Sequence, residues 1–340
     1  MRLPLHGRWL ALTYVLSGIV LPHVARAANV PQERGPAVTP GVTRNRTNYH
    51  GWSDAWMLAN GRVEAIIVPA VGRVMQFKFV DDADGPFWEN RALDGKLPNP
   101  KSKEWGNFGG DKTWPAPQED WPKVTGRAWP PPQSFDSMPV EVQTTDVGLA
   151  LISPVDSHYG IRTRRVVVLT PKQPEMIITT TYEKVSGPSL KVAIWTISQL
   201  RDPIGVFWAP HPQTPWPNGF NEQSDALPIN LAKQDGMLSL TRDPKGAHKI
   251  GAISNFLLWI GDKQALRIAN PYVPNAVYPD HGSNAEVYTN PDPFPYVELE
   301  MLGPFHELGV GEKIEETRIY TLFRRTGMEA GREAKKLLGL

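Results

Sequence analysis

From Arg62 onward, apolar and polar residues alternate with a period of two over many short segments, the pattern of strands with one buried face. The first pair is VEAIIVPAVG followed by RVMQFKFV, where Met75, Phe77 and Phe79 alternate with polar residues. Turn sequences such as KQP and SGP separate the later segments. Those segments are MPVEVQTT, GLALIS, IRTRRVVVL, EMIITTTYEKV, LKVAIWTISQL, GMLSLTR, YVELEML and EKIEETRIYTLF.

Helical periodicity is nearly absent until MEAGREAKKLLGL, which predicts one short C-terminal helix within residues 326–340. Many strands at spacings of roughly 8–15 residues, without intervening helices, predict an all-β fold, a large antiparallel β sandwich. The sequence shows no internal repeat and no linker that would divide it. We therefore expect one sandwich domain over residues 45–325, preceded by an extended segment over residues 28–44.

The first 27 residues have the features of a signal peptide. Arg2 and Arg8 precede an apolar run from Trp9 to Leu21, which is followed by the sequence ARA. A charged start, a short apolar run and small residues at the end are typical of a cleaved signal, and a membrane anchor is the alternative. We expect cleavage after Ala27, an exported (periplasmic or secreted) mature chain, and no membrane span after signal removal.

The charge balance and the cysteine content exclude several classes of function. The 340 residues carry 36 Lys and Arg against 35 Asp and Glu, so nothing favours nucleic acid as a partner. The chain has no Cys, which excludes thiol catalysis and cysteine-ligated zinc. The sequence patterns of serine hydrolases, zinc proteases and Walker-type nucleotide sites are absent as well.

Residues 105–135 read WGNFGGDKTWPAPQEDWPKVTGRAWPPPQSF, a segment unusually rich in tryptophan and proline. We expect residues 89–140 to form an ordered loop rather than sheet, because proline cannot donate to a strand ladder. Long ordered loops usually have a functional reason, and proline presets their shape. An indole face packs against the C–H face of a sugar ring, so Trp114, Trp121 and Trp129 are predicted sugar contacts. The alternative is that these rings fold inward as a small core.

At this block the sequence becomes similar to known proteins. NFGGDKTWPAPQEDW, with WPPPQSFD after it, resembles a bacterial domain family of the galactose mutarotase-like (aldose 1-epimerase-like) superfamily. Three further segments are similar to that superfamily: IIVPAVGRVMQFKF with its turn at Gly72 before Arg73, PDHGSNAEVYTNPDPFPYVELEML, and LGVGEKIEETRIYTLF. The resemblance covers residues 45–325. It implies a twisted antiparallel supersandwich whose concave face binds carbohydrate.

The resemblance also implies a chemistry. In the superfamily's enzymes a Glu removes the proton of the anomeric hydroxyl while a His protonates the ring oxygen, as in general acid–base catalysis. The acidic candidate here is the strand YVELEML, where period two places Tyr296, Glu298 and Glu300 on the face away from the core. We expect that face to lie in the cleft, and a solvated sheet face is the alternative.

Two histidines are the candidates for the acid. His281 lies in YPDHGSNAEVY, just before the acidic strand, and His211 lies in a second Trp/Pro-rich loop, FWAPHPQTPWPNGF. The paired sugar-contacting histidines of the mutarotases match no pair here, so a non-catalytic carbohydrate-binding or envelope-associated module is the alternative function. A polysaccharide lyase or a glycosidase on a related sandwich is less favoured.

The remaining candidates are polar side chains that could bond sugar hydroxyls. Asp111 and Lys112 follow a Gly-Gly pair and could supply an acceptor and a donor, or could be an ordinary solvated pair. The segment YPDHGSNAE has side chains that could hold Ca²⁺, but such residues are more often turn formers, so we predict no metal and no cofactor. The predicted polar contacts are Arg73, Asn107, Asp111, Lys112 and Gln118.

Overall fold

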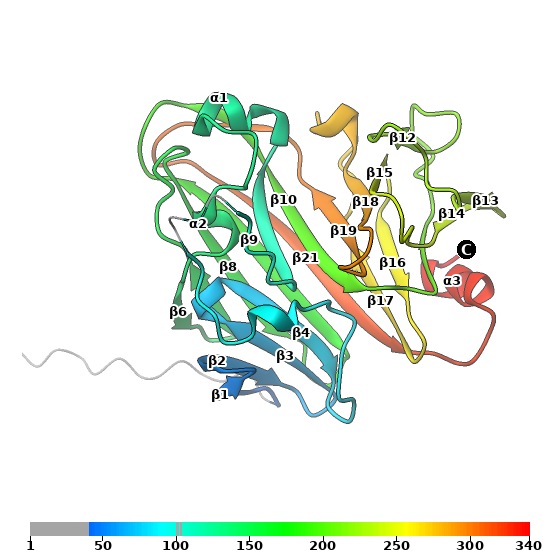
Figure 1. Cartoon of the computed structure of the whole chain (residues 1–340), viewed down its shortest axis with the longest axis horizontal. Helices are drawn as coiled ribbons and strands as arrows, with labels where there is room; N and C mark the ends of the chain where they lie inside the picture. Colours follow the sequence, from blue (N-terminus) through cyan, green and yellow to red (C-terminus); the bar gives the residue numbers. More distant parts are fainter. Residues whose placement is uncertain (1–40, 100–101, 103) are drawn as a thin grey trace, which may run out of the picture. The chain divides into compact units, whose positions relative to one another are not determined.

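The computed structural model describes residues 41–99, 102 and 104–340 (Figure 1). The predicted signal peptide, residues 1–27, and most of the expected extended segment, residues 28–44, lie outside the described residues. The described part contains two antiparallel sheets that form a sandwich and one short C-terminal helix, as the alternating pattern predicts. None of its helices combines the length and the apolar composition needed to cross a bilayer.

The first sheet has eleven strands within the described residues, in the order β1-β2-β3-β4-β5-β10-β19-β18-β15-β12, with β20 paired to β10. Long-range antiparallel pairings, such as β10 with β5 and with β19, hold its centre together. Its strands are β1 (Thr43–Tyr49), β2 (Trp52–Ala59), β3 (Val63–Val68), β4 (Arg73–Phe79), β5 (Asp111–Ala116), β10 (Leu190–Arg201), β12 (Asn221–Glu222), β15 (His248–Ala252), β18 (Ala285–Thr289), β19 (Tyr296–Leu302) and β20 (His306–Leu308).

The second sheet has ten strands within the same residues, in the order β13-β14-β11-β16-β17-β21-β9-β8-β7-β6. Its central strand β21 pairs antiparallel with β17 and with β9. The strands are β6 (Glu141–Thr144), β7 (Leu149–Ile152), β8 (Ile161–Leu169), β9 (Glu175–Lys184), β11 (Gly205–Trp208), β13 (Ala232–Gln234), β14 (Met237–Leu240), β16 (Phe256–Ile260), β17 (Gln264–Ala269) and β21 (Lys313–Arg324).

The helices of the described residues are short, and those before the C-terminal helix lie in connections between strands. The predicted C-terminal helix is α3, whose first turn is capped by the side chain of Glu329, which accepts from two backbone N–H groups. Ala334 and Leu338 pack it against β11 and β16 of the second sheet. The helices are η1 (Pro69–Val71), η2 (Arg91–Leu93), η3 (Gln118–Asp120), α1 (Trp121–Thr125), α2 (Gln133–Asp136), η4 (Asp280–Gly282) and α3 (Ala330–Leu338).

The main hydrophobic core lies between the two sheets. On β19, Val297, Leu299 and Met301 belong to this core together with Trp208 and Tyr320 of the second sheet. A slip of one residue in the pairing of β19 would turn all three side chains out of the core. Since burying each contributes about 1.5–3 kcal/mol, the register is fixed, and the alternate residues are held on the opposite face.

The prediction that residues 89–140 contain no sheet is wrong. Strand β5 lies inside the Trp/Pro-rich segment and pairs antiparallel with β10 from Asp111 to Ala116. On its other side β4 pairs with it only at Asp111, where Val74 is the partner. The rest of that edge has no partner strand within the described residues, so Pro115 costs no ladder hydrogen bond there.

Candidate functional site

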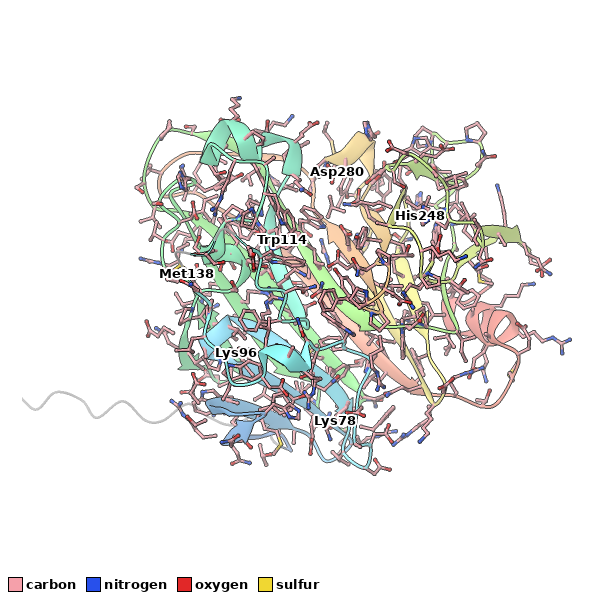
Figure 2. All side chains as sticks on the ribbon, viewed as in Figure 1. Lys78, Lys96, Trp114, Met138, His248 and Asp280 are labelled. Carbon is pink, nitrogen blue, oxygen red and sulfur yellow. The ribbon has the colours of Figure 1, made fainter. Side chains whose placement is uncertain are left out.

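A cavity of about 380 Å³ lies over five neighbouring strands of the first sheet: β5, β10, β19, β18 and β15. We call it the tryptophan cavity. Trp114 comes from β5 at one end of this span, and His248 comes from β15 at the other, as Figure 2 shows. The lining residues are Trp105, Trp114, Gln118, Trp129, Trp195, Gln223, Ser224, Ala247, His248, Lys249, Tyr288, Asn290, Tyr296, Glu298 and Glu300.

Tryptophans pack edge to face at the β5 end of the cavity. The centre of the Trp114 ring lies 5.8 Å from the ring centre of Trp105, 5.9 Å from that of Trp129 and 5.3 Å from that of Trp195. Trp129 is 45% exposed, Trp105 is half-buried, and Trp114 is only 3% exposed. Trp129 and Trp105 therefore have indole area available to a ligand, and Trp114 supports both.

Trp121 lies in the protein interior instead. Its ring is fully buried in a cluster with Trp114 and Trp195, and its indole N–H donates to the carbonyl of Pro115 at 2.8 Å. Trp129 stacks on it with an interplanar angle of 20°. For Trp121 the structure favours the alternative of a small core, and Trp114 belongs to the same buried cluster while also bordering the cavity.

One buried carboxylate, Asp136 in α2, orients the aromatic wall. Trp114 Nε1 donates to its Oδ1 at 2.9 Å, and Trp105 Nε1 donates to its Oδ2 at 3.1 Å. Arg73 Nη2 donates to Oδ1 at 2.8 Å. Burial lowers the pKa of the Arg73 guanidinium, and the charge of Asp136 opposes that shift. Arg73, a predicted sugar contact, is fully buried and serves behind the wall as the counter-charge of Asp136.

Gly72 brings this pair together. Its φ of 65° is left-handed, and a Cβ there would lie 2.8 Å from the carbonyl oxygen of Met138. The close approach is continued by a hydrogen bond from Val140 N to Pro69 O at 3.0 Å. These contacts seat the end of α2 against the start of β4, where Arg73 lies.

Asp111 and Lys112 point to opposite faces of β5, because successive strand residues alternate. Lys112 Nζ lies 3.4 Å from Glu298 Oε1 and 4.8 Å from the centre of the Trp114 ring. Burial lowers the pKa of Lys112, and the charge of Glu298 opposes this. Lys112 thus lies directly behind the cavity, where it pairs with a carboxylate of the lining.

The side chain of Asp111 is directed between the sheets. The hydroxyls of Ser198 and Tyr320 each donate to its Oδ2 at 2.6 Å, and Arg165 pairs with its Oδ1. Asp111 is fully buried and does not line the tryptophan cavity. Its predicted role as a sugar contact does not fit this position, because both of its oxygens are already bonded.

The acidic strand supplies the centre of the lining. Tyr296, Glu298 and Glu300 all border the cavity, on the face that period two predicts. This face is not a solvated one, since Glu298 is 7% and Glu300 is 1% exposed. Two carboxylates at such burial need partners, because an unpaired buried charge is costly.

Glu300 has partners on β10, which neighbours β19, and on β15, which lies two strands away. Trp195 Nε1 donates to its Oε2 at 2.8 Å, and Lys249 Nζ lies 3.0 Å from the same oxygen. Burial raises the pKa of Glu300 well above the ordinary value, and Lys249 opposes the rise. On Lys249 itself burial acts to lower the pKa, but Glu286 and Glu300 outweigh burial and raise it.

Lys249 also offsets the repulsion between two neighbouring carboxylates. Glu286 and Glu300 lie directly opposite each other on β18 and β19, an arrangement that destabilises a sheet. Lys249 on β15 pairs with both, at 2.6 Å from Glu286 Oε2. The cavity floor is therefore a network of paired charges rather than a set of free ones.

His248 lines the cavity, although its sequence context did not single it out as a site residue. Its Nε2 lies 2.9 Å from Asp243 Oδ2 and its Nδ1 lies 2.9 Å from the carbonyl oxygen of Ala226. A backbone carbonyl and a carboxylate thus fix the orientation of the ring through both of its nitrogens. The sequence around His248 gives little sign of a site, since the residue only begins a short strand. It comes near β19 because the sheet places β15 two strands away from it.

The two predicted acids lie elsewhere, and neither lines the tryptophan cavity as the described residues form it. His281 is exposed within η4, at a left-handed φ of 63°. His211 packs near Tyr272, with the ring centres 5.0 Å apart, and its backbone N–H donates to Ile253 O. Of the other predicted contacts, Gln118 borders the tryptophan cavity and Asn107 borders an adjoining one.

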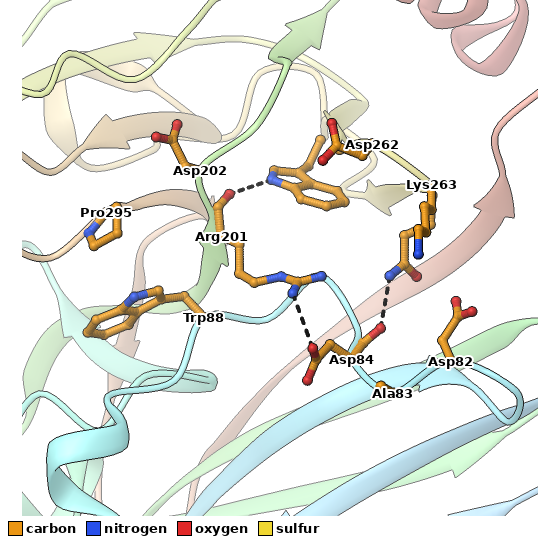
Figure 3. A pocket seen from close by; sticks show the side chains of 12 residues that line it. Asp82, Ala83, Asp84, Trp88, Arg201, Asp202, Asp262, Lys263 and Pro295 are labelled. Carbon is orange, nitrogen blue, oxygen red and sulfur yellow. Dashed lines mark hydrogen bonds and ion pairs between the residues drawn. The ribbon is translucent and has the colours of Figure 1, made fainter. Parts of the chain in front are cut away.

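Another cavity, of about 480 Å³, is lined by Asp82, Asp84, Asp202 and Asp262 together with Arg201 and Lys263 (Figure 3). We call it the acidic groove. Its Arg201–Asp84 pair is well exposed, at 3.7 Å, and its two tryptophans, Trp88 and Trp259, are nearly buried. Exposed charges without an available aromatic face make it the weaker candidate.

Nowhere in the described part do three or more His, Asp or Glu side chains gather to hold a metal ion.

Comparison with known proteins identifies the fold. No protein-family model and no curated protein matches the chain. Among solved structures, a putative aldose 1-epimerase from Escherichia coli K12 matches with a TM-score of 0.53 and 13% identity, over 80% of this chain and 99% of that one. A galactose mutarotase-like protein from Lactobacillus casei matches with a TM-score of 0.53 and 9% identity, over 79% and 100% of the two chains.

A TPR-domain containing protein from Parabacteroides distasonis also matches, with a TM-score of 0.53 and 16% identity over 79% of this chain. The match spans 46% of that protein, so the chain corresponds to about half of it. At these identities the comparisons show the fold alone. The chain has the galactose mutarotase-like β-sandwich fold that the sequence resemblance implies.

Proposed function

We propose that the protein is an exported carbohydrate-binding protein and that the tryptophan cavity is its binding site. The observation that carries this is the pairing of available indole area, on Trp129 and Trp105, with buried carboxylates in the same cavity. An indole covers the C–H face of a sugar ring, and the carboxylates of Glu298 and Glu300 accept from its hydroxyls. Export is proposed from the signal-like residues 1–27.

The charges favour an uncharged sugar. Lys112 is paired with Glu298, and Lys249 is paired with Glu286 and Glu300. The ring of His248 is bonded to Asp243. Both lysines already have carboxylate partners, so they leave no spare positive charge for a uronate or a phosphate. This arrangement also weighs against a polysaccharide lyase acting on uronates.

A second candidate is aldose 1-epimerase-like catalysis in the same cavity, favoured by Glu298 as a possible proton acceptor beside the sugar. The reaction also needs an acid whose pKa is near the working pH. His248 would have to give up its bond to Asp243 to reach a ring oxygen. Tyr288 has a pKa raised to about 12, chiefly by burial, and so is a poor proton donor at neutral pH. The geometry therefore supports binding better than turnover.

Calorimetric titration with neutral hexoses tests the binding proposal. Trp129→Ala is expected to weaken binding by about 1–3 kcal/mol, the scale of one large apolar contact, with little change in thermal midpoint. Trp216→Ala removes a half-buried tryptophan that does not line the cavity and is the matched control. Equal affinities in wild type and Trp129→Ala would refute the placement of the site.

Polarimetry on freshly dissolved single anomers tests the second candidate. If Glu298 is the base, Glu298→Gln keeps the sugar bound but loses about 10²–10⁴-fold in rate, the usual share of acid–base assistance. His281→Asn, which alters an exposed ring, is the control that leaves the rate unchanged. If the wild-type protein binds sugar and never exceeds the spontaneous rate, catalysis is rejected and binding stands.

A further inference from the structure

A cavity of about 510 Å³ adjoins the tryptophan cavity and has no role in the proposal above. Trp105, Asn290 and Tyr296 line both cavities, so the two meet at the same three side chains. We call it the Phe294 cavity, after a ring in its lining that is 45% exposed. Because they share these residues, a ligand that fills the first cavity can extend into the second past Trp105 and Tyr296.

The walls of the Phe294 cavity combine apolar and hydrogen-bonding groups. The ring of Phe294 packs edge to face on Trp88, with the ring centres 6.0 Å apart. This contact fixes the Phe294 ring and leaves much of it exposed. Phe108 and Asn107 also line the cavity. The amide oxygen of Asn107 is buried and has no hydrogen-bond partner in the described part of the chain. A hydroxyl of a ligand would supply the missing donor.

Size and chemistry point to a ligand longer than one ring. Each cavity alone falls within the about 300–1,000 Å³ typical of small-molecule sites. One sugar ring against Trp129 would leave the Phe294 cavity unused. The Phe294 cavity offers an aromatic ring with exposed area and a polar group that can accept a hydrogen bond, so the second position repeats the kinds of contact that the indoles and carboxylates of the first one offer.

We propose that the ligand is a neutral oligosaccharide, with one ring in the tryptophan cavity and the next in the Phe294 cavity. The inference rests on the proposed carbohydrate binding and adds the length of the ligand to it. Trp105 and Tyr296 contact the ligand on both sides of the glycosidic bond. Phe294 is the specificity-determining residue, because it contacts only the second ring.

The test compares ligands of different length on the same protein. Calorimetric titrations use glucose and galactose as single rings, and maltose, cellobiose and lactose as two-ring probes. We expect at least one two-ring probe to bind about 10-fold tighter than its single ring. Phe294→Ala removes this advantage and leaves the affinity for the single ring unchanged. Trp129→Ala weakens both classes of ligand.

Two controls make the result readable. Ile229→Ala changes a highly exposed apolar residue that lines neither cavity, and it should alter no affinity. Phe294→Leu keeps apolar volume and should retain part of the advantage, which separates lost contact from misfolding. If single-ring and two-ring probes bind equally and Phe294→Ala changes nothing, the oligosaccharide inference is overturned while carbohydrate binding stands. If no probe of either length binds the wild-type protein, both proposals fail.

Discussion

Replacing Asp136 by Asn tests whether one carboxylate holds the aromatic wall in place. In the native protein, Asp136 accepts from Trp105, Trp114 and Arg73, and it balances the fully buried charge of that guanidinium. Asn keeps one acceptor oxygen but carries no charge, and its NH₂ group cannot accept from an indole N–H. Asp136→Asn therefore leaves Arg73 as an uncompensated buried cation and frees one tryptophan.

The structure sets the expected magnitude. Removing one partner of a buried ion pair costs about 3–5 kcal/mol, because the remaining charge stays desolvated. The loss of one indole hydrogen bond adds about 1 kcal/mol. The exposed pair between Arg324 and Asp81 provides the comparison: Asp81 is 77% exposed, and its substitution Asp81→Asn should cost at most about 1 kcal/mol.

Urea unfolding of the two variants, followed by tryptophan fluorescence, measures this difference. Near-ultraviolet circular dichroism under native conditions reports whether the indoles keep their fixed orientations. We expect Asp136→Asn to lose stability by several kcal/mol, to lose near-ultraviolet signal and to bind sugar more weakly. If Asp136→Asn and Asp81→Asn prove equally stable, the hydrogen bonds to Asp136 do not organise the wall and the reasoning is refuted.

Three further outcomes are expected. Trp121→Ala should destabilise the fold by about 3–5 kcal/mol in urea titrations, since this ring is core; a loss below about 1 kcal/mol would contradict that. Lys249→Met should destabilise the protein increasingly as the pH rises, because Glu300, whose pKa burial raises, then ionises beside Glu286 without its lysine partner; a pH-independent loss would count against this network. Burial raises the pKa of Glu89 to about 7, so the folded state holds its proton more tightly than the unfolded chain, and stability should fall from about pH 4.5 to pH 7. Glu89→Gln should flatten that part of the stability curve, and an unchanged slope would refute the assignment.

The strands could be predicted because each one has a face in the common core. On β19, alternation alone separates Val297, Leu299 and Met301 from the residues that line the cavity. Strand β5 escaped prediction because Pro115 forbids a central strand unless one edge is unpaired, and pairing is a property of the assembled sheet. Asp111 was predicted in the site because, without a strand there, its opposite orientation to Lys112 could not be known.

The sequence did not allow us to predict which residues come together through the order of strands in the sheet. His248 and Lys249 are about fifty residues from the acidic strand and become its neighbours through β18. Arg73 shows the opposite error, because the resemblance supplied a role in binding that the fold gives to a buried pair with Asp136. Local patterns thus fixed which face each residue takes, whereas long-range pairing decided which residues meet.

The paired charges under the cavity explain how buried carboxylates can serve a neutral ligand. Lys112 pairs with Glu298, and Glu286 and Glu300 share Lys249, so the floor has no unpaired cation while its carboxylate oxygens keep lone pairs for further hydrogen bonds. An anionic ligand would meet no unpaired positive charge there, so the cost of removing its hydration would not be offset. A ligand rich in hydroxyls can donate to those oxygens and cover the indoles of Trp105 and Trp129. The paired charges and the exposed indoles therefore both favour an uncharged ligand that is rich in hydroxyls.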